Sequence, residues 1–396
     1  MRRLIPSTGT PTSFFDLVRA YLPVGGERRF EEAFCRWAGS PWCRFVNSGT
    51  TALYLILKAL RTLRPDRDEV LLPAYTAPSL VLPIRRAGLR PVLCDVDLET
   101  LNADLTDAGG RLTPRTLAFL MIPMYGLPCD AAEARRMAER YGAFLVEDAA
   151  SAMGSRMDGR MAGTRGDVGF LSFNRGKNLS TVSGGVVLTD REEIQQAVAA
   201  QCATLPAASL RAEVRLGVRA FALALAVRPF WYTLLHGTIS RFKYTSLHTD
   251  FEMSRYTDFQ ARLGFSLLRR AETFLTQRHK NGILLYNILS KTEGVALPRI
   301  LPGAHVVFNQ FPVLLSDPET RDAAHRAVLK AGVEATTLYP EPIHRLYGDL
   351  GYGRDPDPFP GATAVSRRLL LLPTHPLIEA SRLREAGEAV IRAVKR

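Results

Sequence analysis

The stretch from Phe144 to Leu188 decides how the chain is expected to fold. It begins with FLVEDAASAMG, residues 144–154, and ends with GFLSFNRGKNLSTVSGGVVL, residues 169–188. The first apolar run is short and continuous and stops at Glu147 and Asp148, as in a strand buried on both faces of a parallel sheet. A second run, 168–173, leads into a polar loop with Lys177, and a third strand is expected from Gly184. The stretch therefore places a carboxylate and an amine at strand ends, where ligands bind.

The sequence around this stretch alternates between strands and helices. Apolar runs at 70–72, 91–94, 118–122 and 143–146 predict strands, and helices are expected near 27–40, 52–60, 78–88 and 130–141. Strands that alternate with helices indicate an α/β fold, with a parallel sheet covered on both faces.

The last third of the chain reads as a second, smaller α+β domain. A helix is expected from 271 to 289, followed by a strand within 305–315, a helix from 318 to 331, a strand at 369–372 and a final helix after Pro376. We predict a large domain over residues 1–265 and a small C-terminal domain over residues 266–396.

A candidate phosphate site precedes the helix at 52–60. The small residues Ser48, Gly49, Thr50 and Thr51 open this apolar helix. A loop of small residues at a helix start presents free backbone N–H groups and the positive end of the helix dipole, which together bind phosphate. Ser and Thr are also ordinary helix caps, so the pattern alone is weak.

Spacing and residue type together resemble the pyridoxal-phosphate (PLP) sugar aminotransferases of the DegT/DnrJ/EryC1/StrS family. The family pattern of Glu-Asp-Ala-Ala, then Ser-Phe-x-x-x-Lys-Asn-Leu, then Gly-Gly, is met at residues 147–150, 172–179 and 184–185. The resemblance implies a fold-type-I enzyme with a mainly parallel seven-stranded sheet. It implies that Lys177 holds PLP as a Schiff base and moves a proton, and that Asp148 pairs with the ring nitrogen. It also places the cofactor phosphate at Ser172, Gly49, Thr50 and Thr51.

The resemblance extends over roughly residues 25–202 and 253–380, with three departures. Ser151 stands where the family usually has Gln or His against the cofactor's phenolic oxygen, Ala77 stands where an aromatic residue commonly stacks on the ring, and Met253 stands where a partner subunit's Asn reaches the phosphate. The motif YPEPIH, residues 339–344, lies near the substrate mouth in the family, so Tyr339 and His344 are predicted substrate contacts.

Residues 203–250 form an insertion that the family lacks. Arg211, Arg215, Arg219 and Arg228 flank an apolar run at 220–227, aromatic residues follow at 230–232, and Arg241 and Lys243 come later. Basic residues beside aromatic and aliphatic ones are typical of a helix in a membrane interface. The alternative is an insertion packed on its own protein or across a dimer contact.

Composition limits the possible partners. The 396 residues carry a net charge of +12, which favours anionic partners such as a nucleotide-linked substrate or an acidic membrane surface. No zinc-finger or helix-turn-helix signature is present, so nucleic acid is not expected, and no metal site is predicted. The five scattered cysteines are expected to be free thiols. No secretory signal and no apolar run of roughly 20 residues is found, which predicts a cytoplasmic protein. A peripheral position at the inner face of the membrane is the alternative that the insertion leaves open.

We therefore predict a PLP-dependent aminotransferase that moves an amino group from an amino-acid donor, such as glutamate, to a keto sugar, which the resemblance makes nucleotide-linked. A homodimer with sites at the subunit interface is expected. The alternatives are another PLP reaction, such as a dehydration, an enzyme acting on a lipid-linked substrate at a membrane surface, and a catalytically weakened binding protein at a membrane. Pyridoxamine phosphate formed after adding glutamate would indicate transamination.

Overall fold

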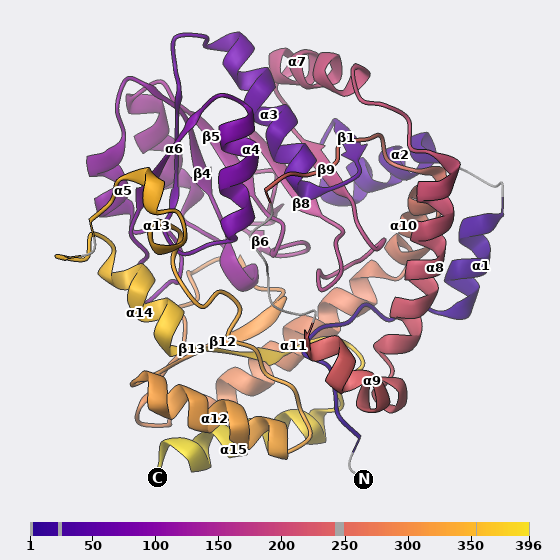
Figure 1. Cartoon of the computed structure of the whole chain (residues 1–396), viewed down its shortest axis with the longest axis vertical. Helices are drawn as coiled ribbons and strands as arrows, with labels where there is room; N and C mark the ends of the chain where they lie inside the picture. The colour runs from indigo at the N-terminus through magenta and orange to yellow at the C-terminus, as the bar shows by residue number, and fades with distance from the viewer. Residues whose placement is uncertain (1–2, 23–25, 242–248, 354, 396) are drawn as a thin grey trace.

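The computed structural model describes residues 3–22, 26–241, 249–353 and 355–395, and a seven-stranded sheet forms its centre (Figure 1). The strand order is β1-β9-β8-β5-β4-β2-β3, with β1 and β9 antiparallel to their neighbours and the other pairs parallel. The strands are β1 (Cys43–Val46), β2 (Glu69–Pro73), β3 (Arg90–Cys94), β4 (Thr116–Met121), β5 (Phe144–Asp148), β8 (Val168–Ser172) and β9 (Gly185–Leu188). The predicted mainly parallel sheet of a fold-type-I enzyme is confirmed.

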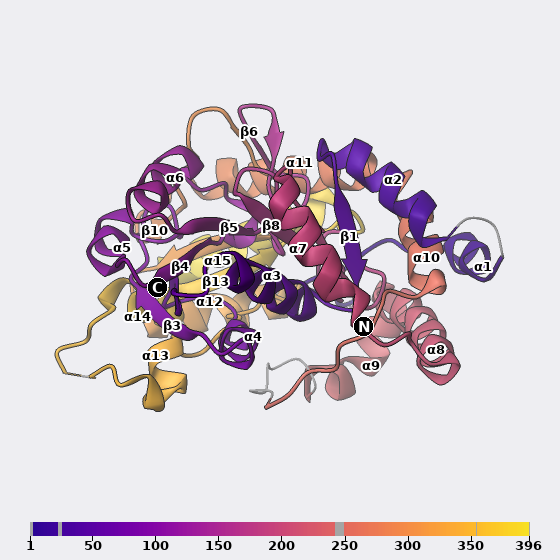
Figure 2. The same ribbon diagram turned by 90° about the horizontal axis from the view of Figure 1, so that it is seen from above.

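Helices cover both faces of this sheet, as expected for strands that are apolar throughout. Residues of β4 and β5 alternate between two core clusters: Leu120 and Val146 pack with α3, whereas Phe119 and Leu145 pack with α5 and α6. The covering helices include α3 (Gly49–Leu63), α4 (Val81–Arg86), α5 (Leu105–Arg111), α6 (Ala131–Arg140) and α7 (Glu192–Ala203). Figure 2 shows α3, α4 and α7 on one side of the sheet and α5 and α6 on the other.

The C-terminal part builds a smaller layer of helices on an antiparallel sheet. The sheet has the order β10-β12-β13, and a second small sheet has the order β11-β6-β7. The strands are β10 (Val295–Ala296), β12 (Gln310–Leu315), β13 (Leu369–Pro373), β11 (Ala304–His305), β6 (Arg156–Met157) and β7 (Arg160–Met161), and the helices are α11 (Ala271–Leu289), α12 (Pro318–Lys330), α13 (Ile343–Leu346), α14 (Pro360–Arg368) and α15 (Ala380–Val394). The predicted boundary at 265/266 falls inside α10 (Asp258–Leu268), and the two-domain division stays a prediction.

The N-terminal residues are more ordered than the sequence suggested. Ile5 bridges to Val333 in the C-terminal part, and a short helix, α1 (Phe14–Tyr21), precedes α2 (Glu27–Ala38). The α1 helix has a complete capping box, in which Ser13 caps the helix and Asp16 bonds back to it. Buried Asp16 also accepts from Ser266 and pairs with Arg270, so α1 is held firmly on the protein.

The insertion folds as two helices, α8 (Leu210–Ala226) and α9 (Pro229–Arg241). It packs partly on its own protein: Tyr232 is buried and donates to Glu334 at 2.7 Å, and Glu213 accepts the N–H of Phe259 at 3.0 Å. Lys243 lies outside the described residues. Among the described residues, no single helix is long and apolar enough to cross a membrane. Leu210–Ala226 and Pro229–Leu235 together form a pair of helices, bent by 101°, whose combined length and composition would allow a span.

Candidate active site

The two strand ends singled out by the sequence meet in one place. Asp148, the last residue of β5, is buried, and its Oδ1 accepts the N–H of Ala150 at 3.0 Å. Burial raises the pKa of the Asp148 carboxyl to about 6, against the opposing effects of the Ala150 N–H and of Lys177. An unneutralised carboxylate held in this environment gains a proton or a cationic partner readily.

The neighbouring carboxylate, Glu147, serves a structural purpose instead. Adjacent strand residues point to opposite faces of a sheet, and Glu147 is fully buried against the guanidinium of Arg165, with 2.6 Å between Oε1 and a guanidinium nitrogen. Only Asp148 of this pair therefore remains as a carboxylate for a ligand.

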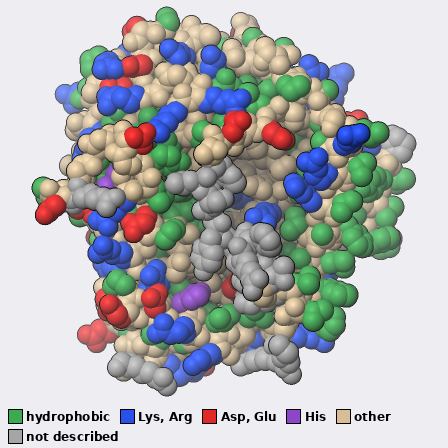
Figure 3. All heavy atoms as spheres, in the orientation of Figure 1, with side chains coloured by type: hydrophobic (Ala, Val, Ile, Leu, Met, Phe, Trp, Pro, Cys, Tyr) green, Lys and Arg blue, Asp and Glu red, His purple; other side chains and the backbone are tan. Residues whose placement is uncertain are grey.

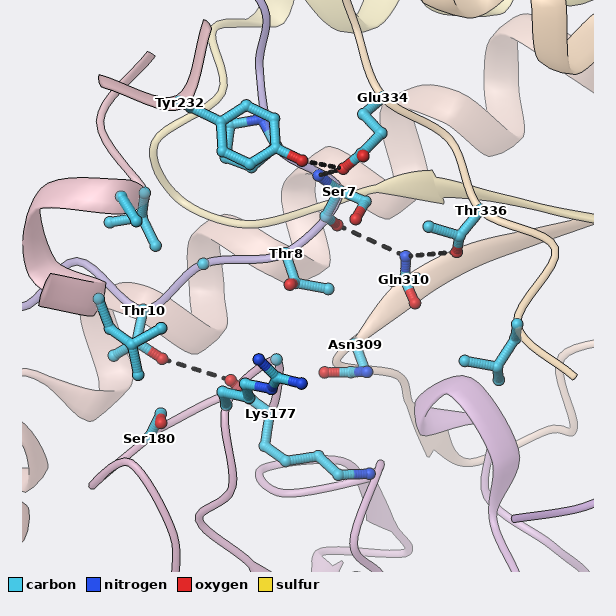
Figure 4. Close-up of a pocket in the computed structure, with 18 of the residues that line it drawn as sticks. Ser7, Thr8, Thr10, Lys177, Ser180, Tyr232, Asn309, Gln310, Glu334 and Thr336 are labelled. Carbon is cyan, nitrogen blue, oxygen red and sulfur yellow. Dashed lines mark hydrogen bonds between the residues drawn. The ribbon is translucent and has the colours of Figure 1, made fainter. Parts of the chain in front are cut away.

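Lys177 lies on the loop between β8 and β9. Gly176 at φ +84° and Val182 at φ +76° give this loop its turns. The Lys177 Nζ donates to Ser151 Oγ at 3.0 Å, and the Lys177 carbonyl accepts from the Thr10 hydroxyl at 3.3 Å (Figure 4). Burial of the amine lowers the pKa of Lys177, with Asp148 acting in the opposite direction. A lysine that loses its proton more readily is a better nucleophile.

The start of α3 has the form of a phosphate cradle. Ser48 caps the helix and accepts the N–H of Thr51 at 3.1 Å, while the N–H groups of Gly49 and Thr50 have no acceptor among the described residues. Ser172, from β8, lies beside Gly49, where an added Cβ would be 3.2 Å from the Ser172 Cβ. Free N–H groups, a hydroxyl and the helix dipole fit a phosphate group. The Thr51 N–H is already used, so Thr51 shapes the helix start.

A cavity of about 740 Å³ lies between the Lys177 loop, the N-terminal residues and the C-terminal part, and Asp148, Gly49, Thr50 and Ser172 are not among its lining residues. Lys177, Ser151 and Tyr339 line it, so the structure brings these three predicted residues together. His344 is not among its lining residues. Its ring is buried against Phe359, with Nε2 3.4 Å from the Asp357 carboxylate, and burial lowers its pKa.

Sequence reasoning missed several residues of this cavity. Residues 6–10 form one wall, and Asn309 and Gln310, at the start of β12, form another (Figure 4). Gln310 donates to the Thr336 hydroxyl at 3.1 Å, and the Asn309 Oδ1 is buried without a hydrogen-bond partner among the described residues. The polar pair Asn309-Gln310, within the otherwise apolar run 306–315, was the available signal.

The three departures from the family pattern lie at different places. Ser151 touches the Lys177 amine directly. Ala77 stands at the start of a short 3₁₀ helix (Pro78–Leu80), and Met253 packs partly buried against the main core. The segment around Met253 lies against Asn47, whose Nδ2 donates to the Glu252 carbonyl at 2.8 Å. Neither Ala77 nor Met253 lines the cavity beside Lys177.

Such an arrangement, with an amine and a carboxylate at neighbouring strand ends and a phosphate cradle at a nearby helix start, defines a PLP-dependent enzyme of fold type I. Comparison with known proteins specifies it further. The model of the DegT/DnrJ/EryC1/StrS aminotransferase family matches residues 25–391. The chain belongs to this family, and it is a PLP-dependent aminotransferase.

Two relatives and two solved structures illustrate the likeness. The dTDP-4-dehydro-2,3,6-trideoxy-D-glucose 4-aminotransferase of Saccharopolyspora spinosa is 30% identical over 93% of this chain and 89% of its own length. The dTDP-4-dehydro-2,6-dideoxy-D-glucose 3-dehydratase of the same organism is 32% identical over 74% of this chain and 63% of its own length. The structure of S. venezuelae DesV matches with a TM-score of 0.75 at 27% identity, over 96% of this chain and 94% of its own. The structure of the aminotransferase TlmJ of Streptoalloteichus hindustanus matches with a TM-score of 0.76 at 26% identity, over 100% of this chain and 99% of its own.

Proposed function

We propose that this aminotransferase transfers the amino group of a glutamate-like amino acid to a nucleotide-linked keto sugar. The relatives named above act on dTDP-linked sugars by their names, and the excess positive charge of the chain, +12, suits an anionic substrate. The observation that carries the proposal is the buried Lys177 amine. Its Nζ lies 3.0 Å from the Ser151 Oγ, and the Asp148 carboxylate is close enough to raise its pKa against the effect of burial.

The proposed roles follow from the geometry of the site. The Gly49 and Thr50 N–H groups and the Ser172 hydroxyl hold the cofactor phosphate, and Thr51 keeps the helix start in shape. Asp148 keeps the ring nitrogen protonated. When bound, PLP would supply an aldehyde that takes up the amino group and a protonated ring that withdraws electrons from the substrate carbon bearing that group.

Lys177 then acts as the group that moves a proton. Its lowered pKa leaves a larger fraction of the amine neutral and able to accept a proton from the substrate carbon. Ser151 accepts the amine's hydrogen bond and so fixes its direction. Tyr339 lines the same cavity and is proposed as a substrate contact, while His344 would act only by holding the 339–344 turn in position.

A spectrum of the purified protein followed by a donor screen tests this proposal. We expect visible absorbance of the lysine-bound cofactor, lost on addition of glutamate as 2-oxoglutarate and pyridoxamine phosphate appear, and restored by a dTDP-linked keto sugar. A protein that binds PLP yet makes no pyridoxamine phosphate with any of the twenty amino acids would refute it.

A sugar dehydration is the second candidate, because one relative named above is a 3-dehydratase. Such a reaction would consume the keto sugar without a stoichiometric amino donor. Mass spectrometry distinguishes the two outcomes, since dehydration releases water from the sugar whereas transamination replaces a carbonyl oxygen with an amino group. A binding protein without activity is disfavoured, because Lys177 and Asp148 keep the geometry that the reaction needs.

We also propose a cytoplasmic homodimer, with active sites at the subunit interface, that meets the inner face of the membrane through residues 203–250. The dimer rests on the family resemblance, and light scattering of the purified protein tests it. The membrane contact is supported by exposed apolar side chains on the insertion, among them Leu210, Phe221 and Leu234.

A further inference from the structure

A surface of exposed apolar side chains runs over three helices that are separated in sequence. Phe14 and Phe15 of α1 are 66% and 71% exposed, Leu210 and Val218 of α8 are 76% and 64% exposed, and Leu234 of α9 is 69% exposed. Figure 3 shows hydrophobic side chains gathered at the right edge of the molecule, where α1 and α8 lie in Figure 1. We call this surface the α1/α8/α9 face. Contiguous exposed apolar surfaces of this kind mark interaction sites.

The helices of the α1/α8/α9 face are packed together and held on the protein. Tyr21 of α1 lies directly over Gly217 of α8, where an added Cβ would be 1.7 Å from the Tyr21 hydroxyl. Asp16 anchors α1 through Ser266, and Tyr232 anchors α9 through Glu334. The outward phenylalanines of α1 are therefore presented on a fixed support.

The polar groups of this face are almost all cationic. Arg19, Arg211, Arg215 and Arg219 are exposed, and none of them pairs with a carboxylate among the described residues. The described parts of the three helices contain two acids, and both are turned to the protein: Asp16 bonds to Ser13, Ser266 and Arg270, and Glu213 accepts from Phe259. The described side chains of the face therefore present apolar groups and positive charge, and none of them is an exposed acid.

This charge pattern decides between two occupants. A second copy of the chain would place the same surface opposite itself, because a two-fold interface is self-complementary, so arginines would approach arginines across a dry contact. A membrane containing anionic lipid offers an apolar interior for the phenylalanines and phosphate groups for the arginines. We propose that the α1/α8/α9 face docks on an anionic phospholipid surface, with α1 as a second docking element outside the insertion.

Docking would bring the active-site cavity close to the lipid. The inner side of α8 lines the cavity that contains Lys177, through Ala220, Leu223 and Ala224, while its outer side belongs to the α1/α8/α9 face. One helix therefore separates the membrane from the cavity. This inference rests on the membrane contact proposed above for residues 203–250 but not on the proposed sugar substrate, so vesicle binding and turnover can fail separately.

The test is co-sedimentation of the full chain with vesicles of phosphatidylglycerol and phosphatidylcholine, compared with vesicles of phosphatidylcholine alone. We expect binding to the anionic vesicles at low salt and release at high salt. Each basic residue near such a surface contributes about 1 kcal/mol, about fivefold in the partition coefficient. The double variant Arg211→Gln/Arg215→Gln should therefore bind about 25-fold more weakly, and the matched pair Arg140→Gln/Arg384→Gln, exposed on α6 and α15, should bind like the wild type.

The apolar part is tested with Phe14→Ser/Phe15→Ser, with Leu98→Ser, an exposed leucine outside the three helices, as its control. We expect the first variant to lose vesicle binding while it keeps its melting temperature, its light-scattering mass and its turnover of soluble substrate. Wild-type protein that stays in the supernatant with anionic vesicles at low salt would overturn the proposal. A change in light-scattering mass on Phe14→Ser/Phe15→Ser would also overturn it and would identify the face as a subunit interface.

Discussion

Replacing Gly185 by alanine tests whether the start of α3 holds the cofactor phosphate. Gly185 lies on β9 between Val46 of β1 and Ser172 of β8, beside the helix start. A Cβ there would lie 2.4 Å from the Ser48 carbonyl oxygen and 2.8 Å from the Gly49 nitrogen, and contacts under 3.0 Å essentially do not occur. Both atoms belong to the backbone, so the strand and the helix start must separate by about 0.6 Å or more.

The expected cost has two parts. Overpacking of this kind costs about 1–3 kcal/mol of folding stability, and displacement of groups that position a ligand by ~1 Å can cost up to 100-fold in function. We expect Gly185→Ala to raise the Kd for PLP at least about tenfold and to lower the melting temperature of the apoprotein.

The assay is fluorescence titration of the apoprotein with PLP, alongside thermal unfolding. Gly110→Ala is the matched control, because Gly110 is an exposed residue of α5 with no atom near an added Cβ. Alanine there should be neutral or stabilising by up to about 1 kcal/mol, since glycine disfavours helix interiors. Wild-type PLP affinity in Gly185→Ala, despite a lowered melting temperature, would show that the phosphate is held elsewhere.

Three further substitutions address the reacting groups. Lys177→Ala should abolish turnover and the visible absorbance of bound cofactor while leaving the melting temperature nearly unchanged. The control Lys280→Ala, at an exposed site on α11, should keep both turnover and absorbance. Turnover by Lys177→Ala would exclude the assigned role. Asp148→Asn should slow turnover yet stabilise the apoprotein by up to about 3 kcal/mol above pH 6, because burial raises the Asp148 pKa from 3.8 to about 6 and the ionised carboxylate opposes folding there. The gain in stability should disappear as the pH falls from about 6 to about 4. A gain that stays constant across this range in thermal unfolding would contradict the reasoning. Ser151→Ala removes the acceptor of the Lys177 amine and should lower kcat about tenfold, as expected for a hydrogen bond worth about 1–2 kcal/mol, with little change in PLP affinity; an unchanged kcat would show that the amine is positioned without it.

The strands and most helices of the large sheet were predictable because their signals are local. Continuous apolar runs between polar ends mark strands buried on both faces. The helices expected near 27–40 and 130–141 are present, with Gly39 as the C-cap of the first and Asp130 as the N-cap of the second. The α1 helix was missed although a signal was available, since Ser13 and Asp16 stand at the spacing of a capping box at its start. The helix has only eight residues, and it is held in place by Ser266 and Arg270, which lie far along the chain.

The candidate site was only partly predictable. Lys177, Asp148 and Ser151 could be identified from residue type and spacing, and Lys177 and Ser151 are in contact. The roles of Asn309, Gln310 and residues 6–10 could not be, because they reach the cavity from segments more than a hundred residues away along the chain. His344 was chosen from a motif, and its ring turns to Asp357 and Phe359 instead.

The sequence by itself determined the fold class, the family and the two strand ends that carry an amine and a carboxylate, because these depend on residue type and on separation along the chain. Only the tertiary structure decided which carboxylate is available: the pleat turns Glu147 to Arg165 and leaves Asp148 without an ion pair to any residue that the structure describes. It also decided that the insertion joins α1 in one cationic apolar face, since contacts such as Tyr21 on Gly217 link segments that no local pattern relates. Burial and long-range contact set the charge state and the exposure of a side chain, and neither is written in its immediate neighbours along the chain.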